Sequence, residues 1–138
     1  LAVLATQGAN GPYTSLVAFA ASQDLRRLVF VTGRATTKYA NLTATPNISM
    51  LIDSRTHSVK DFSEGAAVTV LGAAHEIPEK QNDPLLERFL ARHQYLQEFT
   101  RAPSTAALEV KVKTYLLVTN FQEVVEMDVD QWPSCSTP

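Results

Sequence analysis

Hydrophobic runs alternate with short polar segments along most of the chain, and this pattern predicts a series of β-strands. The runs occupy residues 1–6, 13–21, 27–32, 47–53 and 66–77, and most are separated by glycine, proline, asparagine or serine. Short apolar runs bounded by turn residues are typical of strands that pair with their sequence neighbours. The second run is apolar on both faces from Leu16 on, which predicts a well-buried strand. Gly72 inside the fifth run predicts a bulge or bend.

The C-terminal part of the chain repeats the strand pattern more strictly. From residue 107 on, the stretch LEVKVK places Leu108, Val110 and Val112 on one face and charged residues on the other. This alternation predicts a half-buried strand that continues to residue 118. Residues 121–129 predict a last strand, and residues 130–138 are expected to form a mobile tail.

Two segments carry helical signals. Thr36 is a candidate N-cap, and Tyr39 and Leu42 lie three residues apart, so a short helix is expected before Pro46. Asp83 followed by proline is a second helix start, and apolar residues at helical spacing predict an amphipathic helix over residues 84–99. Residues 55–65 are polar and predict a loop.

Six to seven strands joined mainly by turns, with two helices, predict a mainly β, antiparallel barrel in one domain. The domain is expected over residues 1–129, with the tail over residues 130–138. Because the chain starts at Leu1 inside an apolar run, an upstream segment is also expected.

Composition narrows the classes of function. The 138 residues are 45% hydrophobic and 19% charged, as in an ordinary globular domain. A net charge of −2 without a basic run argues against nucleic acid as the main partner. No apolar run is long enough for a membrane span and no signal peptide is visible. The single cysteine, Cys135, favours a reducing cytoplasm.

Most familiar catalytic and metal-binding patterns are missing from the sequence. The three histidines, His57, His75 and His93, are widely separated and lack metal-ligand spacing, so no metal site is predicted. There is no nucleophile elbow, no Walker loop and no dinucleotide-binding glycine fingerprint. The acidic loop residues are interpreted as solvated carboxylates, and no catalytic residue is predicted.

The stretch VTGRATTKYANL, residues 31–42, is the strongest candidate for chemistry. It leads from a strand into the first turn of a helix, where free amide groups and the helix dipole favour an anion. Thr36 and Thr37 add hydroxyl groups, and Arg34 and Lys38 add positive charge. Polar strand-to-helix turns are also common without a ligand, so both interpretations stay open on these residues alone.

Several stretches in this order resemble the pyridoxamine-phosphate-oxidase-like, FMN-binding split-barrel family. They are LAVLAT, GPYTSLVAF, LVFVTGRATTKYANL, TPNISMLID and AAVTVLGAA, and the resemblance extends over residues 1–129. It implies a small split β-barrel that forms a homodimer, with FMN bound in grooves at the dimer interface.

The resemblance also assigns residues to the phosphate end of that site. Thr32 matches the family's strand-end threonine, and Lys38 matches the lysine of its Ser-Arg-Lys turn. Thr37 stands where the family has arginine, which removes a bidentate anion contact, and Arg34 is the candidate to replace it. Thr36 belongs to the same turn. Asn41 matches a frequent asparagine after it, either as a helix cap or as a hydrogen-bond partner of the turn.

The flavin ring is expected to lie against the neighbouring strands. Backbone groups of Ser15, Leu16 and Val17 match the strand that lines the ring in the family, and Val31 and Thr32 are expected to flank the ring and ribityl chain. Ala67 falls where the family has a glutamine contact.

The resemblance implies an FMN-dependent oxidoreductase that acts on an unknown small molecule. The alternatives are a non-catalytic flavin- or haem-binding or stress-related protein, a deazaflavin (F420) in place of FMN, and a barrel that serves only as an interaction domain. The tail QWPSCSTP lacks the pattern of a true pyridoxamine phosphate oxidase, so that activity is not expected. The segment Asp53-Ser54-Arg55 resembles one of a haem-utilisation-like branch, with a simple ion pair as the equal alternative.

Overall fold

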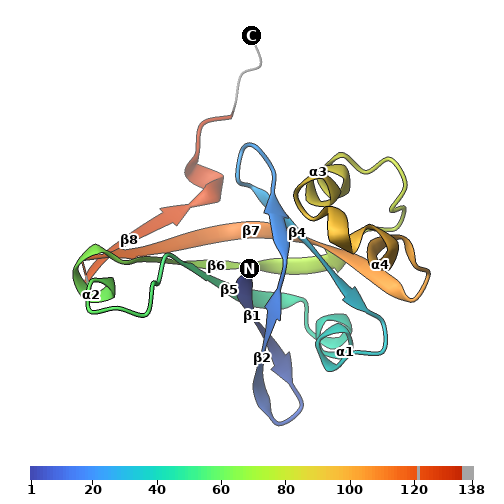
Figure 1. Ribbon diagram of the computed structural model, residues 1–138, viewed down its shortest axis with the longest axis horizontal. Coiled ribbons are helices and arrows are strands. Elements are labelled where there is room, and N and C mark those ends of the chain that lie inside the picture. The colour runs from blue at the N-terminus through green and yellow to red at the C-terminus, as the bar shows by residue number, and fades with distance from the viewer. Residues whose placement is uncertain (121, 135–138) are drawn as a thin grey trace.

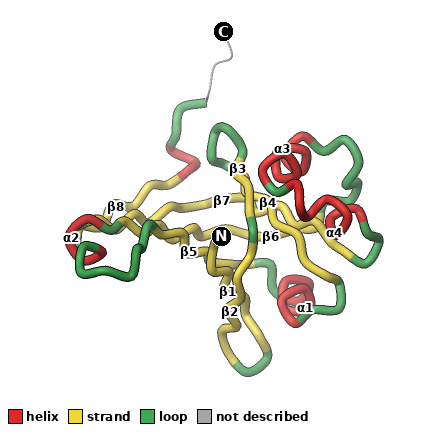
Figure 2. The backbone as a smooth tube through the Cα atoms, viewed as in Figure 1, coloured by secondary structure: helices red, strands yellow, loops and turns green. Residues whose placement is uncertain are grey.

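A computed structural model describes residues 1–120 and 122–134 of the chain (Figure 1). Its described residues form one sheet of eight strands, drawn in yellow in Figure 2. The strands are β1 (Ala2–Gly8), β2 (Gly11–Val17), β3 (Phe19–Ala21), β4 (Arg27–Gly33), β5 (Asn47–Asp53), β6 (Ala66–Glu76), β7 (Thr105–Thr119) and β8 (Glu123–Asp128). All paired strands are antiparallel.

The sheet curls, and its two terminal strands, β2 and β3, follow one another in the sequence. The strand order is β2-β1-β5-β6-β7-β4-β3, with β8 on the far part of β7. Because β2 and β3 are separated only by Ala18, the covalent chain rather than a hydrogen-bond ladder joins the two ends of the sheet. This arrangement confirms the mainly β, antiparallel split barrel that the sequence predicts.

The break at Ala18 changes one expectation. Residues 13–21 form two strands instead of one, and Leu16 is 67% exposed rather than well buried. Side chains alternate between the two faces of β2, so Leu16 points outward where its neighbour Val17 is buried at 4% exposure.

Strand β7 runs through the middle of the sheet and contacts β6, β4 and β8. The predicted alternation is confirmed, since Leu108, Val110 and Val112 are buried. The predicted irregularity at Gly72 is a register shift between β6 and β7. A Cβ atom at Gly72 would collide with the carbonyl oxygen of Lys111, so the close approach of the two backbones requires glycine there.

Two groups of buried side chains make up the core. The larger fills the barrel interior, and the second lies between the sheet and a covering helix. Strand β4 belongs to both: Phe30 points into the interior, whereas Val29 and Val31 pack outside, in the cluster that contains Phe89. Burial on both faces accounts for the uninterrupted apolar run in this strand.

The described residues include four α-helices. They are α1 (Thr37–Ala44), α2 (Asp61–Glu64), α3 (Pro84–Arg92) and α4 (Gln97–Arg101), with short 3₁₀ helices at Gln94–Leu96 and Val129–Gln131. Figure 1 shows α3 and α4 grouped at one end and α2 at the opposite end. None of the described helices is long and apolar enough to cross a bilayer. Both predicted N-caps are confirmed, because Thr36 and Asp83 accept hydrogen bonds from amides of the first helical turn.

Three local predictions are corrected. Residues 55–65 contain α2, because the Asp61 carboxylate accepts hydrogen bonds from the amides of Thr56 and His57 and folds the segment back. The helix expected over residues 84–99 ends at Arg92, since His93 leaves helical geometry and its Nε2 lies 2.8 Å from the carbonyl oxygen of Phe19. Residues 130–132, expected in a mobile tail, pack onto the barrel, where the Trp132 ring stacks on Tyr115. Cys135 lies outside the described residues.

Candidate functional site

The junction between β4 and α1 is held in one geometry by threonine hydroxyl groups. Thr36 Oγ1 donates to the carbonyl oxygen of Gly33 at 2.8 Å and accepts from the amide of Tyr39 at 3.3 Å. Thr32, buried at the end of β4, places its Oγ1 2.9 Å from Thr36 Oγ1. Because the Thr36 hydrogen is already directed at Gly33, Thr32 is the donor in this pair. These hydrogen bonds fix the start of α1 relative to the end of β4.

The first turn of α1 presents unsatisfied donors beside a positive side chain. The amides of Thr37 and Lys38 precede the first intrahelical hydrogen bond, and the turn carries no acidic residue. Within residues 1–120 and 122–134, Lys38 takes part in no salt bridge or side-chain hydrogen bond. Partial burial lowers the pKa of the Lys38 ammonium, which reflects a charge held away from water without a counter-ion. An anion would satisfy all of these groups.

A pocket of about 250 Å³ opens at this turn. Its walls come from the end of β2, the end of β4, the start of α1 and the segment around α4. The lining residues are Leu16, Val17, Ala18, Val31, Thr32, Gly33, Thr36, Lys38, Leu96 and Phe99. Six of the predicted site residues thus share one pocket, with Lys38 and Thr36 as its polar side and Val17, Val31 and Leu96 among its apolar walls.

Four predicted site residues, Ser15, Arg34, Thr37 and Asn41, do not line this pocket. Arg34 forms a salt bridge with Glu76, and its Nε donates to the carbonyl oxygen of Pro103 at 3.1 Å. The bond to Glu76 raises the pKa of Arg34, so its charge is used within the fold. The Thr37 side chain is exposed at the first helical position, and Asn41 donates from Nδ2 to Thr6 Oγ1 at 3.1 Å. Asn41 therefore ties α1 to β1.

Ser15 lies beside the pocket in β2, opposite Leu4 of the core. Its hydroxyl group is buried and has no hydrogen-bond partner. The prediction for Ser15, Leu16 and Val17 concerned their backbone groups. Since β2 pairs with β1 on one side only, alternate backbone groups along its other edge have no ladder partner among the described strands.

Comparison with known sequences decides the family. A sequence model described as pyridoxamine 5'-phosphate oxidase matches residues 1–119. The chain belongs to the pyridoxamine 5'-phosphate oxidase family. No curated protein sequence matches the chain.

Solved structures of similar fold include proteins described as heme-binding, stress-related and heme-storage proteins. A heme binding protein from Mycobacterium smegmatis superposes with a TM-score of 0.81 at 16% identity, covering 94% of this chain and 52% of that one. A general stress protein 26-related protein of the pyridoxinephosphate oxidase family from Clostridium acetobutylicum has a TM-score of 0.72 at 14% identity, covering 94% and 86%. HutZ, the heme storage protein from Vibrio cholerae, has a TM-score of 0.67 at 16% identity, covering 86% and 84%. The chain thus spans about half the length of the M. smegmatis protein, and these similarities concern the fold.

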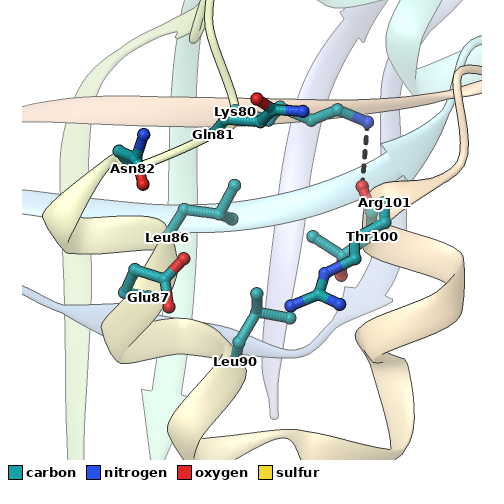
Figure 3. A pocket seen from close by; sticks show the side chains of 8 residues that line it. All are labelled: Lys80, Gln81, Asn82, Leu86, Glu87, Leu90, Thr100 and Arg101. Atoms are coloured by element: carbon teal, nitrogen blue, oxygen red, sulfur yellow. Dashed lines mark hydrogen bonds between the residues drawn. The ribbon is translucent and has the colours of Figure 1, made fainter.

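Apart from the pocket at the β4–α1 turn, a larger pocket of about 540 Å³ lies between the segment after β6 and helices α3 and α4 (Figure 3). The one lysine in its wall, Lys80, donates to the carbonyl oxygens of Thr100, Ala102 and Thr105, each at 2.8 Å. These bonds use all three ammonium hydrogens to join the segment to the end of α4. Size alone therefore does not mark the functional site.

Asp53, at the end of β5, and Arg55 form an ion pair, which was one of the two interpretations of this segment from the sequence. Arg55 lies 2.5 Å from the Asp53 carboxylate, and this hydrogen bond lowers the pKa of Asp53. Both residues line a shallow pocket of about 360 Å³ together with Ala67. Among the described residues, no group of three or more His, Cys, Asp or Glu side chains is arranged to hold a metal ion.

Sequence reasoning missed four lining residues of the 250 Å³ pocket. Ala18 and Gly33 directly adjoin predicted residues, and extending each predicted segment by one residue would have included them. Leu96 and Phe99 are remote in sequence, and their helical spacing indicates only an ordinary amphipathic helix. Only the break at His93 brings them to this position.

Proposed function

We propose that this chain is a homodimeric flavoprotein that binds FMN noncovalently and is an oxidoreductase acting on an unknown small molecule. The observation that carries the proposal is Lys38: a partly buried ammonium group, without a partner among the described residues, beside the free amides of a helix N-terminus. Membership of the pyridoxamine 5'-phosphate oxidase family supports a flavin mononucleotide as the anion. FMN, when bound, would supply hydride or electron transfer, while the protein supplies binding and orientation.

Several groups around the turn would contribute to phosphate binding, each in a different way. Lys38 supplies the charge, and the amides of Thr37 and Lys38 supply directed donors. The Thr37 hydroxyl is exposed at the same helix end and adds a donor. Thr32 and Thr36 have committed their hydroxyl hydrogens to the turn and position it. Arg34 acts through Glu76 and Pro103, and we assign it a positioning role.

The rest of the cofactor would extend from the turn along β2. Val17 and Val31 form apolar walls there, and Leu96 and Phe99 close the pocket from the other side. These side chains exclude water from the space next to the phosphate. The unpaired edge of β2 offers backbone donors and acceptors, and these could recognise the polar edge of a flavin ring.

The site is too small within one chain, which supports a dimer. Its volume of about 250 Å³ lies below the roughly 300–1,000 Å³ of typical small-molecule pockets. Leu16, in the pocket wall, stands opposite Val3 of β1, and Val3 stands opposite Leu51 of β5. Leu16 and Leu51 are 67% and 36% exposed, so an apolar surface continues from the pocket across three strands. A second copy of the chain placed there would cover both the surface and the cofactor.

Titration of the cofactor-free protein with FMN and with riboflavin tests the cofactor. FMN is expected to bind with quenching of its fluorescence and much more tightly than riboflavin, which lacks the phosphate. Equal affinities would show that the phosphate site is not used. Oxidation of NADH or NADPH by the FMN-loaded protein would then distinguish an enzyme from a flavin-binding protein. F420 is tested by competition, because its phosphate would occupy the same turn.

Haem binding is the second candidate, favoured by structures of similar fold described as heme-binding and heme-storage proteins. His93 is engaged with the carbonyl oxygen of Phe19, whereas His57 and His75 are exposed and remain as candidate iron ligands. A haem titration followed by the Soret band, repeated with His57→Ala and His75→Ala, tests this candidate. Loss of the band shift in either variant supports it, and no shift in the parent protein excludes it. A cytoplasmic location, expected from the sequence, stays a prediction.

A further inference from the structure

A further pocket, which we call the mouth pocket, opens at the end of the barrel away from α1. It has a volume of about 380 Å³, and its lining includes Phe19, Ala21, Leu25, Tyr115, Met127 and Trp132. It faces the barrel interior, since Phe19 and Ala21 pack against the interior cluster. The candidate FMN pocket uses Val31 on the outer face of β4. The mouth pocket is therefore a separate site, and its interpretation does not depend on the proposed flavin.

The surface of the mouth pocket is entirely apolar. Because the pocket is open to solvent on one side and its lining offers no polar partner, water in it can bond only to other water molecules. The volume falls within the roughly 300–1,000 Å³ range of small-molecule sites, and mouths of β-barrels are one of the places where such sites occur. A polar or charged ligand would lose its hydration there without compensation, so the lining selects an apolar one.

The rim of the pocket is held in a strained conformation. Leu25, in the turn between β3 and β4, has φ +60°, which is unusual for a bulky side chain. The Tyr115 hydroxyl donates to the carbonyl oxygen of Leu25 at 2.6 Å and stabilises this conformation. As a result, the large apolar side chain of Leu25 lines the pocket in a turn where a glycine or asparagine would relieve the strain. Strain of this kind is concentrated at ligand sites.

The opposite wall comes from the segment after β8, which leads towards the C-terminus (Figure 1). The Trp132 ring stacks on the Tyr115 ring, with the two planes within 1° and the centroids 5.8 Å apart. Arg26 holds this segment with two hydrogen bonds of 3.1 Å, to the carbonyl oxygens of Val129 and Trp132. The indole thus forms one wall that does not belong to the sheet.

We propose that the mouth pocket binds a small apolar molecule, an aromatic ring system or a short alkyl chain, against the Trp132 indole. An aromatic ligand would continue the existing stack of Tyr115 and Trp132 at favourable ring separations. Haem is not the expected occupant, because the pocket contains no histidine to bind iron.

The chain has a single tryptophan, which makes Trp132 a specific reporter for the test. The full chain, as purified, is titrated with N-phenyl-1-naphthylamine, and energy transfer from Trp132 to the probe is measured. Saturable transfer is expected. The variant Ala21→Leu fills the pocket and should raise the probe's dissociation constant about tenfold or more. The matched variant Ala40→Leu makes the same change on the exposed face of α1 and should leave binding unchanged.

Two results would overturn the proposal: no saturable transfer in the parent protein, or equal affinity in the Ala21→Leu and Ala40→Leu variants, which would place the probe elsewhere. If Ala21→Leu does not fold, crystals of the parent protein under xenon pressure give the answer instead. Xenon enters dry apolar cavities, so its density beside Met127 and Trp132 would support the site. Xenon absent from that position would refute it.

Discussion

Replacing Lys38 by alanine tests the phosphate site most directly. The ammonium group is partly buried and has no partner in the part of the chain that the structure describes, so a bound phosphate would be its main electrostatic partner. A hydrogen bond to a charged group contributes about 1.5–3 kcal/mol. If the contact between Lys38 and the phosphate contributes about 2 kcal/mol, Lys38→Ala should raise the dissociation constant of FMN about 30-fold. Riboflavin lacks the phosphate, so its affinity should stay unchanged in the same variant.

Comparing both ligands in both proteins isolates the contact between Lys38 and the phosphate. Binding is measured by quenching of flavin fluorescence, and Lys113→Ala, a change on the exposed face of β7, serves as the control. The folded state should not suffer, because Lys38→Ala removes a desolvated charge that has no partner within the described part of the chain. An equal loss of affinity for FMN and riboflavin would refute the argument, as would no loss for either.

The pH dependence of FMN binding follows from the same group. Burial lowers the pKa of Lys38 from its ordinary value of 10.5, so the ammonium loses its proton earlier than a solvated lysine as the pH rises. FMN affinity should therefore decline on the alkaline side before pH 10.5 is reached. This decline should be missing in Lys38→Ala, and a decline of the same size in the variant would assign it to another group.

Three further results are expected. Thr36→Ala removes the cap of α1 and should lower the free energy of unfolding by about 1 kcal/mol in denaturant titrations, whereas Thr36→Ser should keep most of it; equal losses would mean that the hydroxyl is not the cap. Leu16→Glu places a charge in the proposed dimer surface and should give monomers in analytical ultracentrifugation with weakened FMN binding, while dimers of unchanged affinity would exclude this interface. Burial raises the pKa of Tyr115 to about 12, and the folded state therefore retains this proton after the unfolded chain has lost it. Stability should fall from pH 10 to about 12, a step that Tyr115→Phe should abolish in alkaline unfolding curves.

Much of the fold could be predicted because its signals are local. The strict alternation in β7, the N-caps Thr36 and Asp83 and the bulge at Gly72 each depend on a few neighbouring residues. The helix over residues 84–99 was wrong because helical periodicity continues past His93, and the sequence does not show that this ring bonds the distant carbonyl oxygen of Phe19. A single tertiary hydrogen bond outweighs a weak local preference.

One part of the candidate site could likewise be predicted from local sequence, and another part could not. Thr32, Thr36 and Lys38 belong to one continuous stretch, so a strand followed by a capped helix start was enough to bring them together. The other charged residue of that stretch, Arg34, pairs with Glu76 of β6, and no pattern within residues 31–42 indicates that partner. Neighbouring residues determine the conformation of the turn, whereas the partner of its Arg34 side chain comes from a distant strand.

The sequence by itself determined the strands, the capped turn before α1 and the family to which the chain belongs, because each follows from short-range periodicity or from the order of motifs. Only the tertiary structure decided which charges remain free and which surfaces form pockets. Arg34 is neutralised by Glu76 while Lys38 is not, and Leu96 and Phe99 reach the site from a segment far along the chain. These outcomes depend on which distant strands and helices become neighbours when the sheet curls, and spacing along the chain does not encode that information.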